Sequence, residues 1–68
     1  MTTQAARTVK HFNINSHQLF VEEEGGVYTL VIIGPVGRLE SKGYANMAQA
    51  NGAFCFAVEL IKDNILSL

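Results

Sequence analysis

The sequence predicts a small α+β domain, in which an antiparallel β-hairpin or three-stranded meander packs against one long C-terminal helix. Two stretches carry this prediction. Residues 18–33 place two apolar, strand-like runs on either side of Gly25-Gly26, which is the pattern of a hairpin. Residues 44–66 repeat apolar side chains at helical spacing and are rich in Ala, Met, Gln, Glu and Leu, which favour helix. A chain of 68 residues has room for one domain, which we place at residues 7–68 after a flexible N-terminus of residues 1–6.

Further strand and turn signals surround the hairpin. Residues 7–14 alternate loosely as a strand does, and Asn15 and Ser16 supply turn chemistry after them. Glycine at positions 25 and 26 accepts the positive φ angles of a two-residue turn, which pairs Val21 with Leu30. Gly34-Pro35 ends the second hairpin strand because proline cannot donate to a ladder, and residues 36–40 are expected to return as a short further strand.

The hairpin has two distinct faces, because side chains along a strand alternate with a period of two. The face expected to form the core carries Leu19, Val21, Tyr28, Leu30 and Ile32. The opposite face carries Phe20, Val31 and Ile33, diluted by polar side chains. This second face is apolar enough to be stabilised by burial against a partner, so we treat it as a candidate interface.

The helix has one stripe for the core and one apolar pair outside it. Its expected N-cap is Ser41, whose hydroxyl can accept a backbone N–H of the first turn. The predicted core stripe gathers Met47, Asn51, Phe54, Val58, Ile61 and Ile65, flanked by Tyr44, Ala50, Cys55 and Ala57. Phe56 and Leu60 are four residues apart on or beside the opposite, polar side. Fully exposing such side chains forgoes roughly 1.5–3 kcal/mol each, so Phe56 and Leu60 are also candidate interface residues.

Asn51-Gly52 leaves a second fold open. Gly52 could end a short helix, since a left-handed glycine commonly follows a helix C-terminus. Residues 54–60 would then alternate as a strand in a ββαβ order, with Phe54 and Phe56 on one face. One glycine inside a helix costs only about 1 kcal/mol relative to alanine, so one long helix is the main prediction.

Charge and cysteine content indicate which classes of partner and which cellular compartment to expect. Five Lys/Arg against six Asp/Glu give a net charge of −1, without the basic patch that binds phosphate backbones, so nucleic acid is not an expected partner. The longest apolar run, residues 30–33, is too short to span a bilayer, and residues 1–7 lack the apolar segment of a signal peptide. A single cysteine excludes an internal disulfide and predicts cytoplasmic localisation. Domains this small commonly need a disulfide, a metal or oligomerisation, and oligomerisation is the expected one here.

No group of reactive side chains predicts catalysis, a cofactor or a bound metal. His11 and His17 would stand near 20 Å apart on one extended strand, at about 3.3 Å per residue, and the close-spaced pairs of zinc sites are missing. Cys55 lies beside the apolar stripe and is expected to be a small core residue.

The run Glu22, Glu23 and Glu24 lies at the solvated hairpin tip, where general acid–base catalysis is not expected. Its charges would keep the turn soluble and discourage edge pairing. The functional interpretation is an acidic prong that contacts a basic protein partner.

Ser41-Lys42-Gly43-Tyr44, placed after a strand and before an Ala-rich helix, resembles the repeat of small YegP-like proteins. In that family a Ser-x-x-Tyr element joins a β-meander to a helix. The resemblance covers a short stretch of the chain and implies this fold order, and it implies no site because the family has little assigned chemistry.

The function expected from these features is a non-catalytic protein-binding module that associates with itself. A homodimer would bury one apolar surface and leave the other, with the acidic prong, for a protein partner. Small domains of this style are often phage or mobile-element inhibitors of host machinery, defence complexes included, and that is one form of this role. The alternative is a structural or accessory subunit whose apolar surfaces are permanent interfaces of a larger complex.

Overall fold

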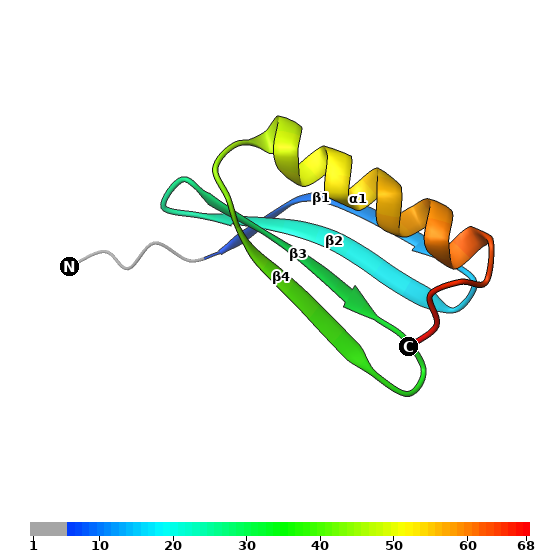
Figure 1. The fold of residues 1–68 in the computed structure, drawn as a ribbon. Coiled ribbons are helices and arrows are strands. Elements are labelled where there is room, and N and C mark those ends of the chain that lie inside the picture. Colours follow the sequence, from blue (N-terminus) through cyan, green and yellow to red (C-terminus); the bar gives the residue numbers. More distant parts are fainter. Residues whose placement is uncertain (1–5) are drawn as a thin grey trace.

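The computed structural model describes residues 6–68, which form one antiparallel sheet with one helix lying across it (Figure 1). The elements are β1 (Arg7–Ile14), β2 (His17–Glu24), β3 (Val27–Ile33), β4 (Arg38–Tyr44) and α1 (Met47–Lys62). The strands lie side by side in chain order, so the sheet is a meander. The predicted α+β class with one C-terminal helix is confirmed, and the sheet has four strands where two or three were expected. The terminus predicted to be flexible, residues 1–6, lies outside the described residues except for Ala6.

Two tight turns set the register of the first three strands. Asn15 and Ser16 have φ angles of 49° and 64°, and Gly25 and Gly26 have φ angles of 60° and 82°, as two-residue hairpin turns between right-twisted strands require. The second turn pairs Val21 with Leu30 and Leu19 with Ile32, as the sequence predicted.

The helix begins five residues later than expected, because Ser41 is part of β4. Ser41 pairs with Leu30 of β3, and its hydroxyl lies 2.9 Å from that of Tyr44. The N-cap is Asn46, whose side-chain oxygen accepts the Gln49 N–H at 2.9 Å. Gln49 in turn accepts the Ala45 N–H at 3.1 Å, so the side chains of Asn46 and Gln49 together satisfy two backbone donors at this helix end. The prediction of Ser41 as N-cap was therefore wrong.

The helix continues through Gly52, so the alternative ββαβ order is excluded. Gly52 is exposed inside α1, and a side chain there would meet nothing within 4 Å. The helix ends instead at Asp63, and Asn64 follows with a φ angle of 59°. The N–H groups of Asn64 and Ile65 reach back to the carbonyls of Ile61 and Leu60, which is the Schellman arrangement.

The core lies between α1 and one face of the sheet. Its buried residues are Leu19, Val21, Leu30, Ile32, Ala50, Phe54, Ala57 and Ile61. Two of the four helix residues are alanines, which let the helix backbone approach the sheet closely. The helix is therefore turned relative to the predicted stripe, so that Ala50 and Ala57 are central and Cys55 is exposed. The prediction of Cys55 as a core residue was wrong for this reason.

The segment after α1 closes one end of the core. Leu66 and Leu68 pack against the core residues. His17 is only 5% exposed, and its Nε2 accepts the Leu68 N–H at 2.9 Å while its Nδ1 lies 2.7 Å from the Asn15 carbonyl oxygen. The Leu68 carbonyl accepts the Val36 N–H at 3.2 Å. These contacts join the turn before β2, the turn before β4 and the end of the chain segment described.

Candidate protein-binding surfaces

The helix covers only one face of the sheet, and the other face holds the first predicted interface (Figure 1). Phe20 and Val31 are directly opposite each other on β2 and β3, and Ile33 follows on the same face. Val31 has no exposed surface, because its neighbours cover it within the monomer. Phe20 and Ile33 are half-buried, so these two side chains provide the apolar area that this face offers to a partner.

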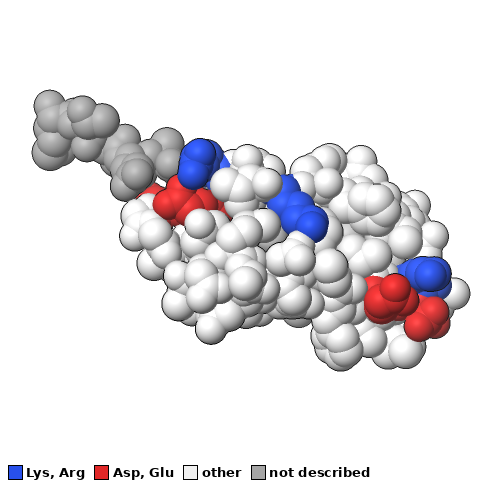
Figure 2. Space-filling view, turned by 90° about the horizontal axis from the view of Figure 1, so that it is seen from above, with Lys and Arg blue, Asp and Glu red and all other residues white. Residues whose placement is uncertain are grey.

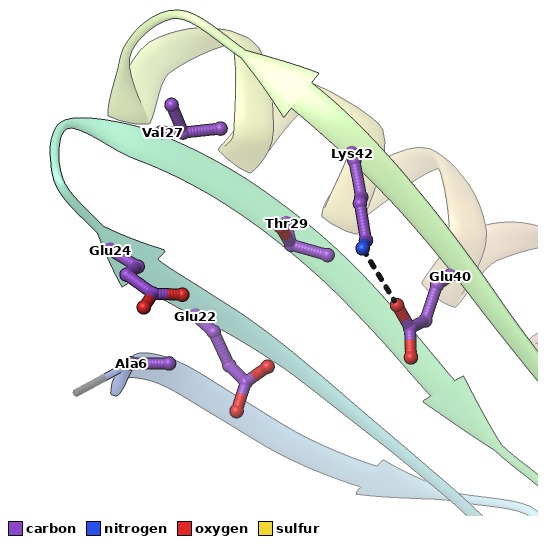
Figure 3. A pocket seen from close by; sticks show the side chains of 7 residues that line it. All are labelled: Ala6, Glu22, Glu24, Val27, Thr29, Glu40 and Lys42. Carbon is purple, nitrogen blue, oxygen red and sulfur yellow. Dashed lines mark ion pairs between the residues drawn. The ribbon is translucent and has the colours of Figure 1, made fainter.

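A hollow of about 240 Å³ lies at one end of this open face (Figure 3). Its floor is Val27 and Thr29 of β3, and its walls are Glu22 and Glu24 of β2 and Glu40 and Lys42 of β4. The short β3 side chains lie between longer ones on the neighbouring strands, which produces the hollow.

The two walls of this hollow differ in charge compensation. Glu40 lies 2.7 Å from Arg38 Nη2 and 3.9 Å from Lys42 Nζ. Within residues 6–68, Glu22 and Glu24 have no ion-pair partner. The β2 wall of the hollow therefore carries two carboxylates without a compensating positive charge.

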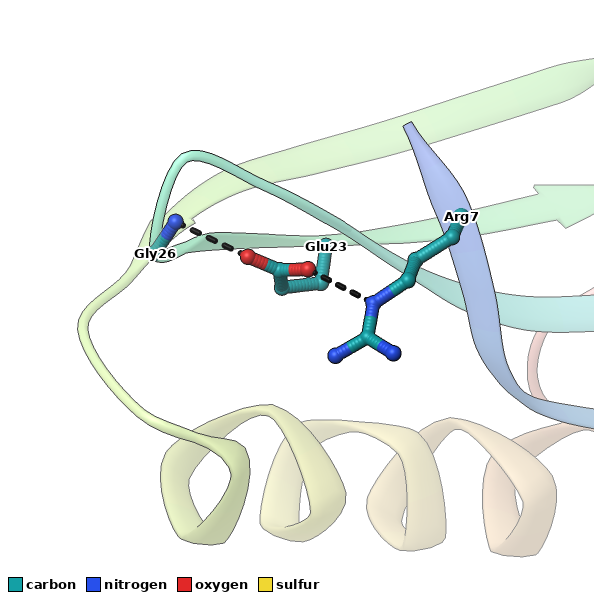
Figure 4. Close-up of polar contacts among 3 residues, drawn as sticks. All are labelled: Arg7, Glu23 and Gly26. Atoms are coloured by element: carbon teal, nitrogen blue, oxygen red, sulfur yellow. Dashed lines mark hydrogen bonds and ion pairs between the residues drawn. The ribbon is translucent and has the colours of Figure 1, made fainter. Parts of the chain in front are cut away.

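Glu23 points to the opposite face and has a different role (Figure 4). One carboxylate oxygen accepts from Arg7 Nε at 2.8 Å, and the other accepts the Gly26 N–H at 2.9 Å. The bond to Arg7, followed by the bond to the Gly26 backbone, lowers the pKa of Glu23 below its usual value of 4.5. The three glutamates therefore do not form one prong: Glu22 and Glu24 face outward from the open face, whereas Glu23 ties the β2–β3 turn to β1.

Replacing Arg7 with glutamine should raise the pKa of Glu23 toward 4.5, because it removes the largest cause of the lowering, the hydrogen bond from Arg7, together with the attraction of the Arg7 charge. A carboxylate with a lowered folded-state pKa contributes stability that is complete above its ordinary pKa and is lost as pH falls through the lowered value. The variant should therefore be less stable than wild type at neutral pH, and the two proteins should be equally stable at strongly acidic pH. Carboxyl NMR titration measures the shift. Arg38→Gln, which removes an arginine bound to Glu40, is the matched control and should leave Glu23 unchanged; an identical Glu23 titration in Arg7→Gln would contradict the contact.

The flank of α1 that carries Phe56 and Leu60 is the second predicted interface. Phe56 is 65% exposed, and Leu60 is half-buried one turn later. Successive helix residues differ by about 100° in direction, so Phe56 points away from the side of α1 on which Cys55 lies.

The opposite flank of α1 forms an apolar groove with β1, which sequence reasoning did not single out. The groove has a volume of about 230 Å³ and is lined by Phe12, Phe54, Cys55, Val58 and Glu59. Phe12 is 45% exposed on the outermost strand. Lys10 lies at one end of the groove, where its ammonium group is 5.0 Å from the centroid of the Phe54 ring and contacts the Asn51 side chain.

The side chains with reactive groups are either engaged or isolated. Both ring nitrogens of His17 are in hydrogen bonds, to Asn15 and Leu68. Cys55 is exposed at the groove. In the part of the chain that the structure describes, no three His, Cys, Asp or Glu side chains gather as a metal site would require, and no helix is long and apolar enough to cross a membrane.

Comparison with models of protein families, with curated proteins and with solved structures found no match to this chain. The resemblance of Ser41–Tyr44 to the YegP-like repeat therefore has no matching family model beside it. Evidence for function comes from the surfaces described above.

Proposed function

We propose that this protein is a non-catalytic protein-binding module of the cytoplasm that associates with itself. The observation that carries the proposal is the amount of large apolar surface left uncovered in so small a domain. Among residues 6–68, six large apolar side chains are at least 40% exposed: Phe12, Val27, Val36, Leu39, Phe56 and Ile65. Isolated exposed apolar residues are ordinary, but here they accompany an uncovered sheet face and an apolar groove.

Small size supports self-association over a solitary monomer. A single core in a chain of 68 residues supplies only a few kcal/mol of net stability, and small domains commonly add a disulfide, a metal or a second subunit. The one cysteine cannot form a disulfide within the chain. Burying exposed aromatic groups against a second copy provides stabilisation of the right kind, at about 25 cal/mol per Å² of apolar surface.

The arrangement of ionisable groups supports a binding role over a catalytic one. General acid–base catalysis needs enclosed groups whose pKa values are pushed apart. Glu22 and Glu24 stand on an open hollow, and the buried His17 has both ring nitrogens occupied by backbone groups. The uncompensated carboxylates of Glu22 and Glu24 suit contact with a basic partner surface, where they would mainly speed association.

Sedimentation over a concentration series tests the self-association. We expect the purified 7.4 kDa chain to sediment as a monomer at low concentration and as a particle of twice that mass at high concentration. The measurement should be made at two salt concentrations, since an apolar interface persists when surface charges are screened. A single 7.4 kDa species at every concentration would end the self-association proposal.

A further inference from the structure

We propose that the groove between β1 and α1 is the seam of the homodimer, in which β1 pairs antiparallel with β1 of a second copy. The inference rests on the proposed self-association and names its surface. β1 lies at the edge of the sheet, with β2 as its only neighbouring strand among residues 6–68. Alternate residues along such an edge direct N–H and C=O groups outward, where an added strand can pair with them.

The regular part of β1 is centred on Phe12. The register with β2 shifts between Thr8 and Lys10 and is unbroken from Lys10 to Ile14. A two-fold axis at Phe12 therefore pairs Lys10 of one copy with Ile14 of the other. The two Phe12 rings, each 45% exposed in the monomer, meet across the seam, and cross-strand aromatic pairs are favourable.

The other edge of the sheet is less suited to strand addition. Residues Arg38, Glu40 and Lys42 place a charge at every second position of β4. The register with β3 is also irregular near Gly43, which has a φ angle of 91°. Charges and irregularities of this kind protect edge strands from pairing. From Lys10 to Ile14, β1 carries one Lys and no Arg, Asp or Glu.

The charges along the groove fit a second copy in this orientation. α1 runs beside β1 in the same direction, since Lys10 contacts Asn51 and Asn15 donates to the Ile61 carbonyl. Lys10 thus marks one end of the groove and Glu59 lies toward the other. Antiparallel pairing brings Lys10 of each copy toward the Glu59 end of its partner.

The remaining charges do not oppose this arrangement. Lys62 and Asp63 follow Glu59 and balance each other in formal charge, and Arg7 is already bound to Glu23. Figure 2, which views the molecule from the helix side, shows few charged groups across the middle of the surface and more toward the two ends.

The size of the surface also suits a second copy. A stable interface of standard size takes about 800 Å² from each partner, close to a fifth of the 4409 Å² surface of this chain. The seam would draw this area from the outer edge of β1 and the flank of α1 beside it.

Phe12→Asp tests the centre of the seam. Phe56→Asp is its matched control, because this seam leaves the Phe56 flank of α1 outside the dimer and free for another partner. Sedimentation should show a dimer dissociation constant raised about thirty-fold or more by Phe12→Asp and little changed by Phe56→Asp. A dimer of unchanged strength in a folded Phe12→Asp protein overturns the seam but leaves the proposed function standing. A wild type that is monomeric at every concentration overturns both.

A charge swap tests the two-fold orientation without touching Phe12. Lys10→Glu and Glu59→Lys should each raise the dissociation constant about five-fold, and the double variant should restore it, because opposite charges again face each other across the seam. Two single effects that simply add in the double variant would overturn the proposed pairing. If Phe12→Asp does not fold, this charge swap by itself tests whether the groove between β1 and α1 is the dimer seam.

The native cysteine offers a direct readout of which flank faces the partner. Cys55 is exposed at the groove, so a bismaleimide should link two wild-type chains, and Phe12→Asp should abolish that link. In the comparison protein Cys55→Ser with Phe56→Cys, the cysteine moves by one residue to the other flank. More efficient linking through position 56 than through position 55 would overturn the seam.

Discussion

Replacing Phe54 with alanine should lower the free energy of unfolding by roughly 3–5 kcal/mol. Phe54 is 4% exposed and packs among the core residues of β2 and β3, and its ring also lies under the Lys10 ammonium group. Native domains have a free energy of unfolding of roughly 0.05–0.15 kcal/mol per residue, so a loss of this size is a large part of the total for so short a chain. Urea denaturation followed by circular dichroism should find the variant largely unfolded or very near its midpoint without denaturant.

Phe56→Ala removes the same number of atoms two residues away and serves as the control. Phe56 is 65% exposed, and surface substitutions usually change stability by about 0.5 kcal/mol or less. We expect this variant to fold like wild type. Similar losses from Phe54→Ala and Phe56→Ala would contradict the orientation of α1 on the sheet.

Gly34→Ala should have the second largest effect, because the end of the chain segment described packs directly on this glycine. A Cβ atom at position 34 would lie 2.6 Å from the Leu68 carbonyl carbon and 2.9 Å from Cδ2 of His17, and closer still to the Leu68 carbonyl oxygen. Leu68 would have to move, and with it the bonds to His17 and Val36. Overpacking of this kind costs roughly 1–3 kcal/mol, which shifts the melting temperature of a domain this small by about 4–8 °C per kcal/mol.

Gly37→Ala is the matched control for Gly34→Ala. A Cβ at position 37 would lie 3.6 Å from the Leu68 Cβ, which is an ordinary contact distance. Thermal melts should separate the two variants clearly, with Gly37→Ala close to wild type. A Gly34→Ala protein as stable as Gly37→Ala would show that the Leu66–Leu68 segment does not pack where it is described.

The strand register was predictable because it depends on local chemistry. Gly25-Gly26 permits one tight turn, and with a side-chain period of two that turn assigns Leu19 and Val21 to one face and Phe20 to the other. The helix start was harder to predict because Ser41 and Asn46 are both acceptable caps. The choice between them depends on how far β4 pairs with β3, which is a tertiary contact.

Which side of α1 faces the sheet also depends on tertiary packing. The spacing of apolar residues predicted a buried stripe made mainly of large side chains, with Cys55 beside it. In the folded protein the small residues Ala50 and Ala57 face the sheet instead, because they let the helix lie close to it. The exposed position of Phe56 could still be predicted, since it lies well away from either version of the stripe.

The candidate surfaces were predictable in part. Alternation identified the apolar open face, but the complete burial of Val31 depends on the side chains around it in the folded sheet. Phe12 was missed because residues 7–14 alternate weakly, and because only the strand order reveals that β1 lies at an edge beside α1. The separation of Glu23 from Glu22 and Glu24 follows from alternation, whereas its bond to Arg7 depends on the position of β1.

The meander order of the strands has a consequence for the route by which this chain folds. Every neighbouring pair of strands is consecutive in the chain, so each pairing closes only a short loop. Loop-closure entropy is then small for the sheet, and chains dominated by such local contacts reach the native state quickly. The contacts that α1 and the segment after it make with the first two strands span much longer loops: Lys10 and Asn51 are 41 residues apart, and His17 and Leu68 are 51 apart. We therefore expect the hairpins to form early and α1 to dock late onto the face that carries Leu19, Val21, Leu30 and Ile32.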